Sequence, residues 1–248
     1  MISVAARALG LLLFFGSQAN ALCPANEDGL LSIVIDDLGY RLEAGEAAIR
    51  LPAPVTLAVI PGTPYAQALM AAAGERDKEI IIHMPMAASL QAPGDPYTLL
   101  LDMSEHEFEH TLSQAFEELA GATGLNNHMG SALTADRSAM NRVMGELAKR
   151  DMFFIDSRTT EDSLAMDVAR ELGVPAFARS VFLDNDRDAA KIAEQLKIAV
   201  DLARRKGRAL AIGHPFPETL RVLDELLPQL PIALTIVPAS QLARCQTH

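Results

Sequence analysis

The sequence predicts an α/β protein built on a parallel sheet that is either open or closed into a barrel. Short apolar runs alternate with amphipathic helical patterns along almost the whole chain, and repeated alternation of this kind is typical of parallel sheets. The 248 residues contain no Pro/Ser-rich linker, low-complexity tract or internal repeat. A single domain of ordinary α/β size is therefore expected.

Short apolar runs are expected to form the strands of this sheet. A short apolar run of this kind is typical of a buried strand. These runs are residues 31–36, 55–60, 79–84, 124–129, 152–156, 175–178, 208–213 and 232–237.

Amphipathic segments between these runs are expected to form helices. Thr63 and Pro64 open one helix with a cap residue and a proline at the first helical position, and Ser104 opens another with a capping box. Further helices are predicted over residues 136–150, 162–172, 188–206 and 217–228. The stretch from Ala87 to Met103 follows neither period, and a loop of that length at the mouth of a sheet more often faces a substrate.

The first 21 residues have the pattern of an export signal. Arg7 supplies a positive start, residues 8–16 form a short apolar segment, and Ala19-Asn20-Ala21 has the small-residue spacing of a cleavage site. The apolar segment is too short to span a bilayer. We therefore expect residues 1–21 to be removed on export, leaving residues 22–248 as one domain in the periplasm or outside the cell.

Composition narrows the choice of partners. The whole chain has a formal charge of −11, and removing residues 1–21 takes away one basic residue and no acid, which leaves −12. That balance argues against nucleic acid or an anionic membrane surface as the partner. No later segment has the length and apolarity of a membrane span. Nothing in the sequence indicates an oligomeric state.

The two cysteines, Cys23 and Cys245, lie near the ends of the expected mature chain. In an oxidising compartment they are expected to pair and to tie the termini together. Chain-entropy arguments give about 4–5 kcal/mol as an upper figure for closing so long a loop. The alternative is a pair of unlinked terminal thiols.

Polar side chains recur where predicted strands end. The adjacent acids Asp36 and Asp37 repel one another unless a cation or a shared proton lies between them. Parallel strands place all their carboxyl ends at one edge of the sheet, so the residues there should converge. The full set is Asp36, Asp37, His83, His128, Asp156, Arg158 and His214. The pattern predicts a site, and most simply a metal site.

Each of these residues also has a purely structural interpretation. The two acids could cap a helix and a turn, His83 could be a core histidine, and His128 could belong to a structural loop. Asp156 and Arg158 could simply pair with each other, and His214 could mark the end of a strand. Convergence of so many at successive strands favours the site.

A second motif, His106-Glu107-Phe108-Glu109-His110, matches the H-E-x-x-H pattern of zinc metalloproteases. That pattern requires a helix buried beside the metal and a third ligand. Here it falls in the acidic first turns of a capped helix. We expect a solvated helix face rather than a zinc site.

Six motifs in order carry a family resemblance. They are Ile-Asp-Asp-Leu-Gly-Tyr, Ile-His-Met-Pro-Met, Asn-Asn-His-Met-Gly-Ser, Phe-Ile-Asp-Ser-Arg-Thr, Val-Phe-Leu-Asp-Asn and Gly-His-Pro. Together they resemble the divergent polysaccharide deacetylase family, a distant branch of the polysaccharide deacetylase (NodB-homology) superfamily, from about Leu30 to Leu242. The resemblance implies a distorted (β/α) barrel of about seven parallel strands with a divalent metal, Zn²⁺ being the expected ion, at the carboxyl face.

The resemblance also implies roles for individual residues. By position Asp36 is the catalytic base, and Asp37 and His83 are metal ligands. The superfamily's second ligand histidine, four residues beyond the first, is replaced by Ala87, so His128 is expected as the third ligand. Asp156, Asp184 or water remain alternatives for that third position.

The remaining site residues are assigned in the same way. His214 matches the general acid, with Asp156 as the carboxylate that orients a catalytic group and Arg158 keeping that carboxylate charged. Asn127 and Arg158 are expected at the cleft, and Asp184 is expected either there or as a cap for the next helix.

These assignments imply an exported metal-dependent hydrolase of carbon–nitrogen amide bonds. It would remove N-acetyl groups from a polysaccharide or peptidoglycan-type glycan of the cell envelope, as a step in carbohydrate metabolism. The missing second histidine and the missing arginine of the superfamily's R-x-P-Y motif keep two alternatives open. One is a glycan-binding or envelope-organising protein without turnover, and the other is a metal hydrolase acting on a peptidoglycan amide or a phosphoester.

Overall fold

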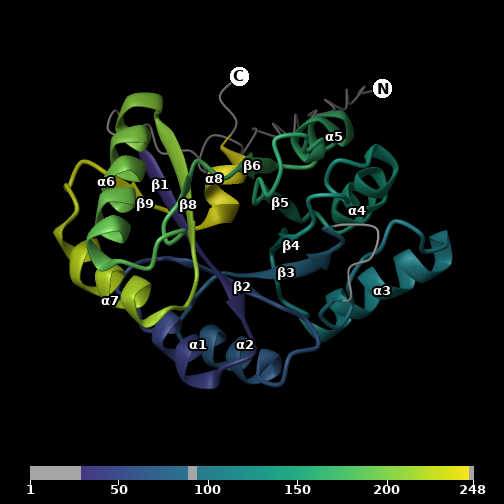
Figure 1. The fold of residues 1–248 in the computed structure, drawn as a ribbon, viewed down its shortest axis with the longest axis horizontal. Coiled ribbons are helices and arrows are strands. Elements are labelled where there is room, and N and C mark those ends of the chain that lie inside the picture. The colour runs from purple at the N-terminus through teal and green to yellow at the C-terminus, as the bar shows by residue number, and fades with distance from the viewer. Residues whose placement is uncertain (1–28, 89–93, 246–248) are drawn as a thin grey trace, which may run out of the picture.

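The computed structural model of the protein describes residues 29–88 and 94–245 (Figure 1). The predicted export signal, residues 1–21, and one partner of the predicted disulfide, Cys23, lie outside the described residues. The other partner, Cys245, is buried in the interior. Within the described ranges no helix combines the length and apolarity needed to cross a membrane.

The described chain is an α/β fold around one curled, parallel sheet, which confirms the predicted class. The strands lie in the order β6-β5-β4-β3-β2-β1-β8-β7, and the short β9 pairs with β1. Their bounds are β1 Leu30–Leu38, β2 Thr56–Val59, β3 Ile80–Met86, β4 Gly124–Met129, β5 Phe153–Asp156, β6 Ala176–Ala178, β7 Val181–Phe182, β8 Arg208–Gly213 and β9 Thr235–Ile236. The end strands β6 and β7 do not pair with each other, so the sheet is a half-barrel.

The main row of the sheet has eight strands, close to the seven or so expected. Each predicted run overlaps one of the observed strands, and the additional strand is β7. It is only two residues long, Val181–Phe182, and a run that short carries no detectable period in the sequence. The last predicted run, residues 232–237, contributes only the two paired residues of β9.

Seven helices of the described chain cover the outer face of the curled sheet (Figure 1). Their bounds are α1 Leu42–Ile49, α2 Ala66–Gly74, α3 Glu105–Glu118, α4 Arg137–Lys149, α5 Ala165–Leu172, α6 Ala189–Lys206 and α7 Pro217–Leu226, with a 3₁₀ turn at Leu227–Gln229. The short helix α8, Ala239–Arg244, lies inside the curl instead. The capping box at Ser104 forms as predicted. The helix start predicted at Thr63 and Pro64 is wrong, because α2 begins at Ala66 and the Thr63 hydroxyl donates to the carbonyl of Ile60 instead of capping the helix. Glu107 of the H-E-x-x-H motif is part of that box, and His106 and His110 are exposed.

The core has two parts because neighbouring side chains of a strand point to opposite faces. On β1, Ile33 and Ile35 belong to the larger cluster beneath the outer helices. Val34 between them belongs to a smaller cluster inside the curl, which Leu242 of α8 also joins. The short helix α8 contacts both β1 and β5, so it fills one end of the half-barrel and leaves the other end for the site.

The capping box of α3 gives a test of this local assignment. Ser104 Oγ accepts a hydrogen bond from the backbone N–H of Glu107, and the Glu107 carboxylate accepts one from the backbone N–H of Ser104. We expect Ser104→Ala to lower the free energy of unfolding by about 1 kcal/mol, measured by urea denaturation. Ser113→Ala, within the same helix, is the matched control and should be neutral or slightly stabilising. Equal effects of the two changes would contradict the capping role.

Candidate metal centre and acid–base pair

A bulge in β1 brings two adjacent carboxylates to the same histidine. The pairing of β1 with β2 shifts between Ile35 and Leu38, where three residue steps on β1 match two on β2. Asp37 within this bulge has a left-handed backbone, φ 57°. In a regular strand adjacent side chains point to opposite faces. Here Asp36 Oδ2 and Asp37 Oδ1 lie 3.7 Å and 3.1 Å from Nε2 of His83.

The three predicted metal ligands converge, each contributing one donor atom. Asp37 Oδ1 lies 3.1 Å from His83 Nε2 and 3.1 Å from His128 Nδ1, and the two histidine nitrogens are also 3.1 Å apart. Metal–ligand bonds to histidine and carboxylate are about 2.0–2.2 Å, so all three atoms can bond to a single ion. Asp37, His83 and His128 therefore form a group that could bind a metal ion, and the donor set suits the divalent ion that the sequence predicts.

His83 is held with one nitrogen directed at this group. Its Nδ1 lies 2.8 Å from Oδ1 of Asn126, whose Nδ2 donates to Asp36 Oδ1 at 2.8 Å. Because the Asn126 amide nitrogen faces a carboxylate, its oxygen faces His83 and accepts a proton from Nδ1. Nε2 is then the nitrogen directed at the donor group, where it would bind a metal after losing its proton, and such outer partners commonly orient ligand histidines.

His128 is held by an acid from the long loop between β3 and α3. Its Nε2 lies 3.2 Å from Asp95 Oδ2, which leaves Nδ1 directed at the triad. The hydroxyl of Tyr40 donates to the other oxygen of Asp95, and burial together with this acid raises the pKa of Tyr40 to about 12. The side chain of His128 is 21% exposed, against 3% for His83.

The electrostatics of the cluster favour an added positive charge. Burial opposes ionisation of Asp37, but hydrogen bonds from His128 and His83 outweigh it and hold the pKa of Asp37 well below its usual value. Burial likewise opposes protonation of His83, yet the charge of Asp36 and the hydrogen bond to Asp37 raise its pKa to about 9. Burial raises the pKa of Asp36. A divalent ion would supply the charge these groups attract.

His214 forms a separate pair with Asp184 beside the triad. Its Nδ1 lies 2.9 Å from Asp184 Oδ1, and its Nε2 lies 3.6 Å from Asp37 Oδ2. Asp184 is buried and also accepts hydrogen bonds from the backbone N–H of His214 and from Thr219 Oγ1, both at 2.7 Å. Burial opposes protonation of His214, but its carboxylate neighbours outweigh burial and raise its pKa.

The structure therefore differs from the expected surroundings of two acids. Asp184 is the carboxylate that orients His214, a role expected for Asp156. The helix that follows Asp184 is α6, and the described chain caps it with Asp188 rather than Asp184. Asp156 instead accepts hydrogen bonds from Arg158 N and Ser163 Oγ. The reason is the order of the strands. His214 directly follows β8, which lies beside β7, whereas β5 lies on the far side of the sheet.

The triad and His214 line one cleft of about 380 Å³. It is bordered by Asp36, Asp37, His83, Asn127, His128, Met129, Ser157, Arg158, Thr159, Arg179, Phe182, Asn185 and His214. Asn127 and Arg158 thus lie where the sequence placed them. Asp184 lies behind His214 rather than on the cleft wall.

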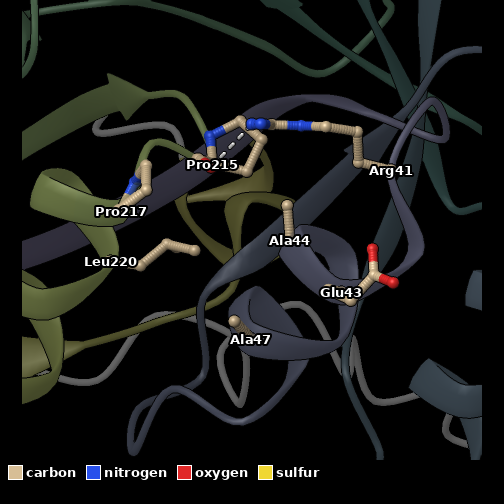
Figure 2. A pocket seen from close by; sticks show the side chains of 7 residues that line it. All are labelled: Arg41, Glu43, Ala44, Ala47, Pro215, Pro217 and Leu220. Atoms are coloured by element: carbon tan, nitrogen blue, oxygen red, sulfur yellow. Dashed lines mark hydrogen bonds between the residues drawn. The ribbon is translucent and has the colours of Figure 1, made fainter.

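A second hollow of similar size lies between α1 and α7 (Figure 2). Arg41 and Glu43 are its charged residues, and its remaining lining is Ala44, Ala47, Pro215, Pro217 and Leu220. The Arg41 guanidinium donates to the carbonyl of Pro215 at 3.5 Å. None of the predicted catalytic, metal-binding or cleft residues, all of which the structure describes, lines this hollow.

Several supporting residues escaped the sequence reasoning. Asn126 was detectable, because it is two positions before His128 on β4 and a strand places such residues on one face. Asp95 and Tyr40 follow no periodic pattern that connects them with His128. Arg179 lies between two very short strands, where the sequence carries no signal for its orientation.

Comparisons with known proteins agree with this architecture. A family model described as divergent polysaccharide deacetylase matches residues 33–243. The uncharacterized protein YibQ of Escherichia coli (strain K12) is 40% identical over 214 residues, which cover 86% of this chain and 67% of that protein.

Solved structures give the same picture of the fold. The uncharacterized protein ATU2773 from Agrobacterium tumefaciens C58 has a TM-score of 0.81 at 25% identity, over 90% of this chain and 94% of that one. The catalytic domain of peptidoglycan N-acetylglucosamine deacetylase from Eubacterium rectale has a TM-score of 0.51 at 13% identity, over 87% and 90% of the two chains. This more distant likeness concerns the fold alone.

The contact between Asp95 and His128 predicts an effect on metal affinity. Asp95→Asn weakens the acceptor that fixes the His128 ring, and loss of such an outer partner typically lowers metal affinity about 10–100-fold. We expect a drop of this size in Zn²⁺ affinity, measured by competition with a chelator. Asp102→Asn removes the same charge from the same loop at an exposed position and should leave the affinity unchanged. Equal losses in the two variants would indicate a general charge effect instead.

Proposed function

Because the chain belongs to the divergent polysaccharide deacetylase family, we propose that it is an exported, metal-dependent hydrolase that removes N-acetyl groups from a glycan of the cell envelope. The observation that carries the proposal is the arrangement of two functional units in one cleft. A three-atom donor set from Asp37, His83 and His128 lies beside an oriented histidine, His214. The export pattern of residues 1–21 supports a place in the periplasm or outside the cell.

Asp37, His83 and His128 would hold the ion, for which we propose Zn²⁺. A divalent ion in such a set supplies Lewis acidity toward water and an amide carbonyl. The outer partners Asn126 and Asp95 orient the two histidines for this role.

Asp36 is the proposed general base. It is buried, it lies in the same cleft as the triad, and its carboxylate is oriented by the amide of Asn126. Burial raises its pKa, which makes the carboxylate a stronger base than an exposed aspartate. Asp36 would take the proton of a water molecule that attacks the acetyl carbonyl.

His214 is the proposed general acid. Asp184 fixes its Nδ1, so Nε2 is the atom that reaches the cleft. A protonated Nε2 would give its proton to the departing sugar amine, and the products would be acetate and a partly deacetylated glycan. The neighbouring acids favour the protonated ring.

Metal content and acetate release test the proposal together. We expect near-stoichiometric Zn²⁺ in the purified protein after reconstitution, and its loss in both His83→Ala and His128→Ala, measured by elemental analysis. Acetate release from N-acetylated envelope glycans should depend on this metal. Asp36→Asn should lower the release at least about 100-fold, the usual contribution of a general base.

Other results would support the rival functions. Stoichiometric metal without acetate release from any N-acetylated glycan would favour a binding protein that has lost turnover. Release of a peptide or amino acid from peptidoglycan instead of acetate would favour an amide hydrolase. Absence of metal after reconstitution would contradict the hydrolase mechanism.

The two acids Asp184 and Asp156 can be separated by kinetics. We expect Asp184→Asn to lower kcat at least about 10-fold with metal content unchanged, because it removes the carboxylate that orients His214. Asp156→Asn should leave the pH dependence of kcat unchanged, since Asp156 bonds Arg158 N and Ser163 Oγ rather than His214. A larger loss of kcat in Asp156→Asn than in Asp184→Asn would return the orienting role to Asp156. Circular dichroism would verify that both variants are folded.

A further inference from the structure

A strained arginine stands at the carboxyl end of β5, on the wall of the cleft. Arg158 has a left-handed backbone, φ 51°, in the turn that follows Asp156. This backbone conformation is unfavourable for most residues other than glycine, asparagine and aspartate. Non-glycine residues held in it persist where the surrounding structure enforces them, frequently at functional sites.

Here the surrounding structure enforces the turn through four hydrogen bonds. The backbone N–H groups of Ser157 and Arg158 donate to Asn127 Oδ1 at 2.9 Å and to Asp156 Oδ1 at 2.8 Å. The carbonyls of the same two residues accept from Arg179 Nε at 2.7 Å and Nη2 at 2.9 Å. Asn127 and Asp156 are fully buried, so the turn is fixed by interior groups.

The side chain of Arg158, unlike its backbone, makes no hydrogen bonds to the described residues. Within residues 29–88 and 94–245, the Arg158 guanidinium has no hydrogen bond or ion pair. Burial raises the pKa of Asp156, the acid two residues before it, and the charge of Arg158 lowers that pKa in part, but both carboxylate oxygens of Asp156 are engaged by Arg158 N and Ser163 Oγ. Arg179 also lines the cleft, but its guanidinium is bonded to the two carbonyls of the turn. Of the two arginines that line the described cleft, Arg158 is therefore the one whose guanidinium N–H groups are available to a ligand.

We propose that Arg158 binds a carboxylate of the substrate, so the glycan taken by this cleft is acidic. This inference rests on the proposed function and narrows its substrate class to N-acetylated glycans that carry a carboxylate near the acetamide. A guanidinium matches a carboxylate through two parallel hydrogen bonds. The carboxylate could belong to a uronic acid or to the lactyl ether of a muramic acid, which share this chemistry.

Binding of defined oligosaccharides distinguishes the possibilities. Zn²⁺-loaded protein carrying Asp36→Asn, which stops turnover, would be titrated calorimetrically with three probes. Chitotetraose is neutral, a hyaluronan tetrasaccharide carries uronic acids, and the disaccharide of N-acetylglucosamine and N-acetylmuramic acid carries a lactyl carboxylate. We expect at least one acidic probe to bind about ten-fold or more tightly than chitotetraose, as one charge-assisted contact would give. The acidic probe preferred identifies the source of the carboxylate.

Arg158→Gly in the same background tests the residue itself. Glycine adopts the left-handed backbone without strain, so the thermal midpoint should be unchanged or higher while the preference for the acidic probe disappears. Arg41→Gln is the matched control: it removes an exposed arginine outside the cleft and should preserve the preference.

Several outcomes would overturn the inference. Equal affinity of the Zn²⁺-loaded Asp36→Asn protein for neutral and acidic probes would overturn the inference while leaving the deacetylase proposal intact. So would a preference that survives Arg158→Gly, or a lowered thermal midpoint with equal losses for all probes, which would mark Arg158 as structural. If the Zn²⁺-loaded Asp36→Asn protein bound none of the three probes, both the inference and the proposed function would be overturned.

Discussion

The bulge in β1 is the constraint on which the rest of the site depends. A regular strand would send Asp36 and Asp37 to opposite faces, one into the helix-covered layer and one into the curl. The extra residue and the left-handed backbone of Asp37 bring both carboxylates to His83. Two carboxylates so close together repel one another unless positive charge lies nearby. The neighbouring histidines can supply that charge when protonated, or they can bind a metal ion that supplies it.

The other strand ends complete what this bulge begins. His83 and Asn126 come from β3 and β4, which pair in register at these two residues. His128, two residues further along β4, reaches the same group from the same face. The third donor atom therefore comes from the neighbouring strand, while the position four residues beyond His83 is the buried Ala87. Asp95 becomes part of the site because its carboxylate contacts His128, the more exposed of the two histidines.

The class of the fold and the location of the site were predictable from the sequence because both follow from periodic patterns. Alternating runs indicated the parallel sheet, and polar residues at strand ends marked the edge where Asp37, His83 and His128 meet. What the sequence could not give was the order of strands in the sheet. Without it Asp156 and Asp184 could not be distinguished as partners of His214. The contact of Asp95 with His128 depends on the path of an aperiodic loop, which local propensities do not determine.

The amide of Asn126 has a consequence for how this site can change. It bonds His83 with its oxygen and Asp36 with its nitrogen, so the proposed ligand and the proposed base share one support. Replacing His83 or Asp36 with a side chain that cannot hydrogen-bond would leave one end of the Asn126 amide unpaired. An unpaired amide group is unfavourable in this buried position. Substitutions at these three positions should be strongly non-additive. A substitution that alters the proposed metal ligand His83 while preserving the proposed base Asp36, or the reverse, must therefore be accompanied by a compensating change at Asn126. These three residues are expected to change together in evolution.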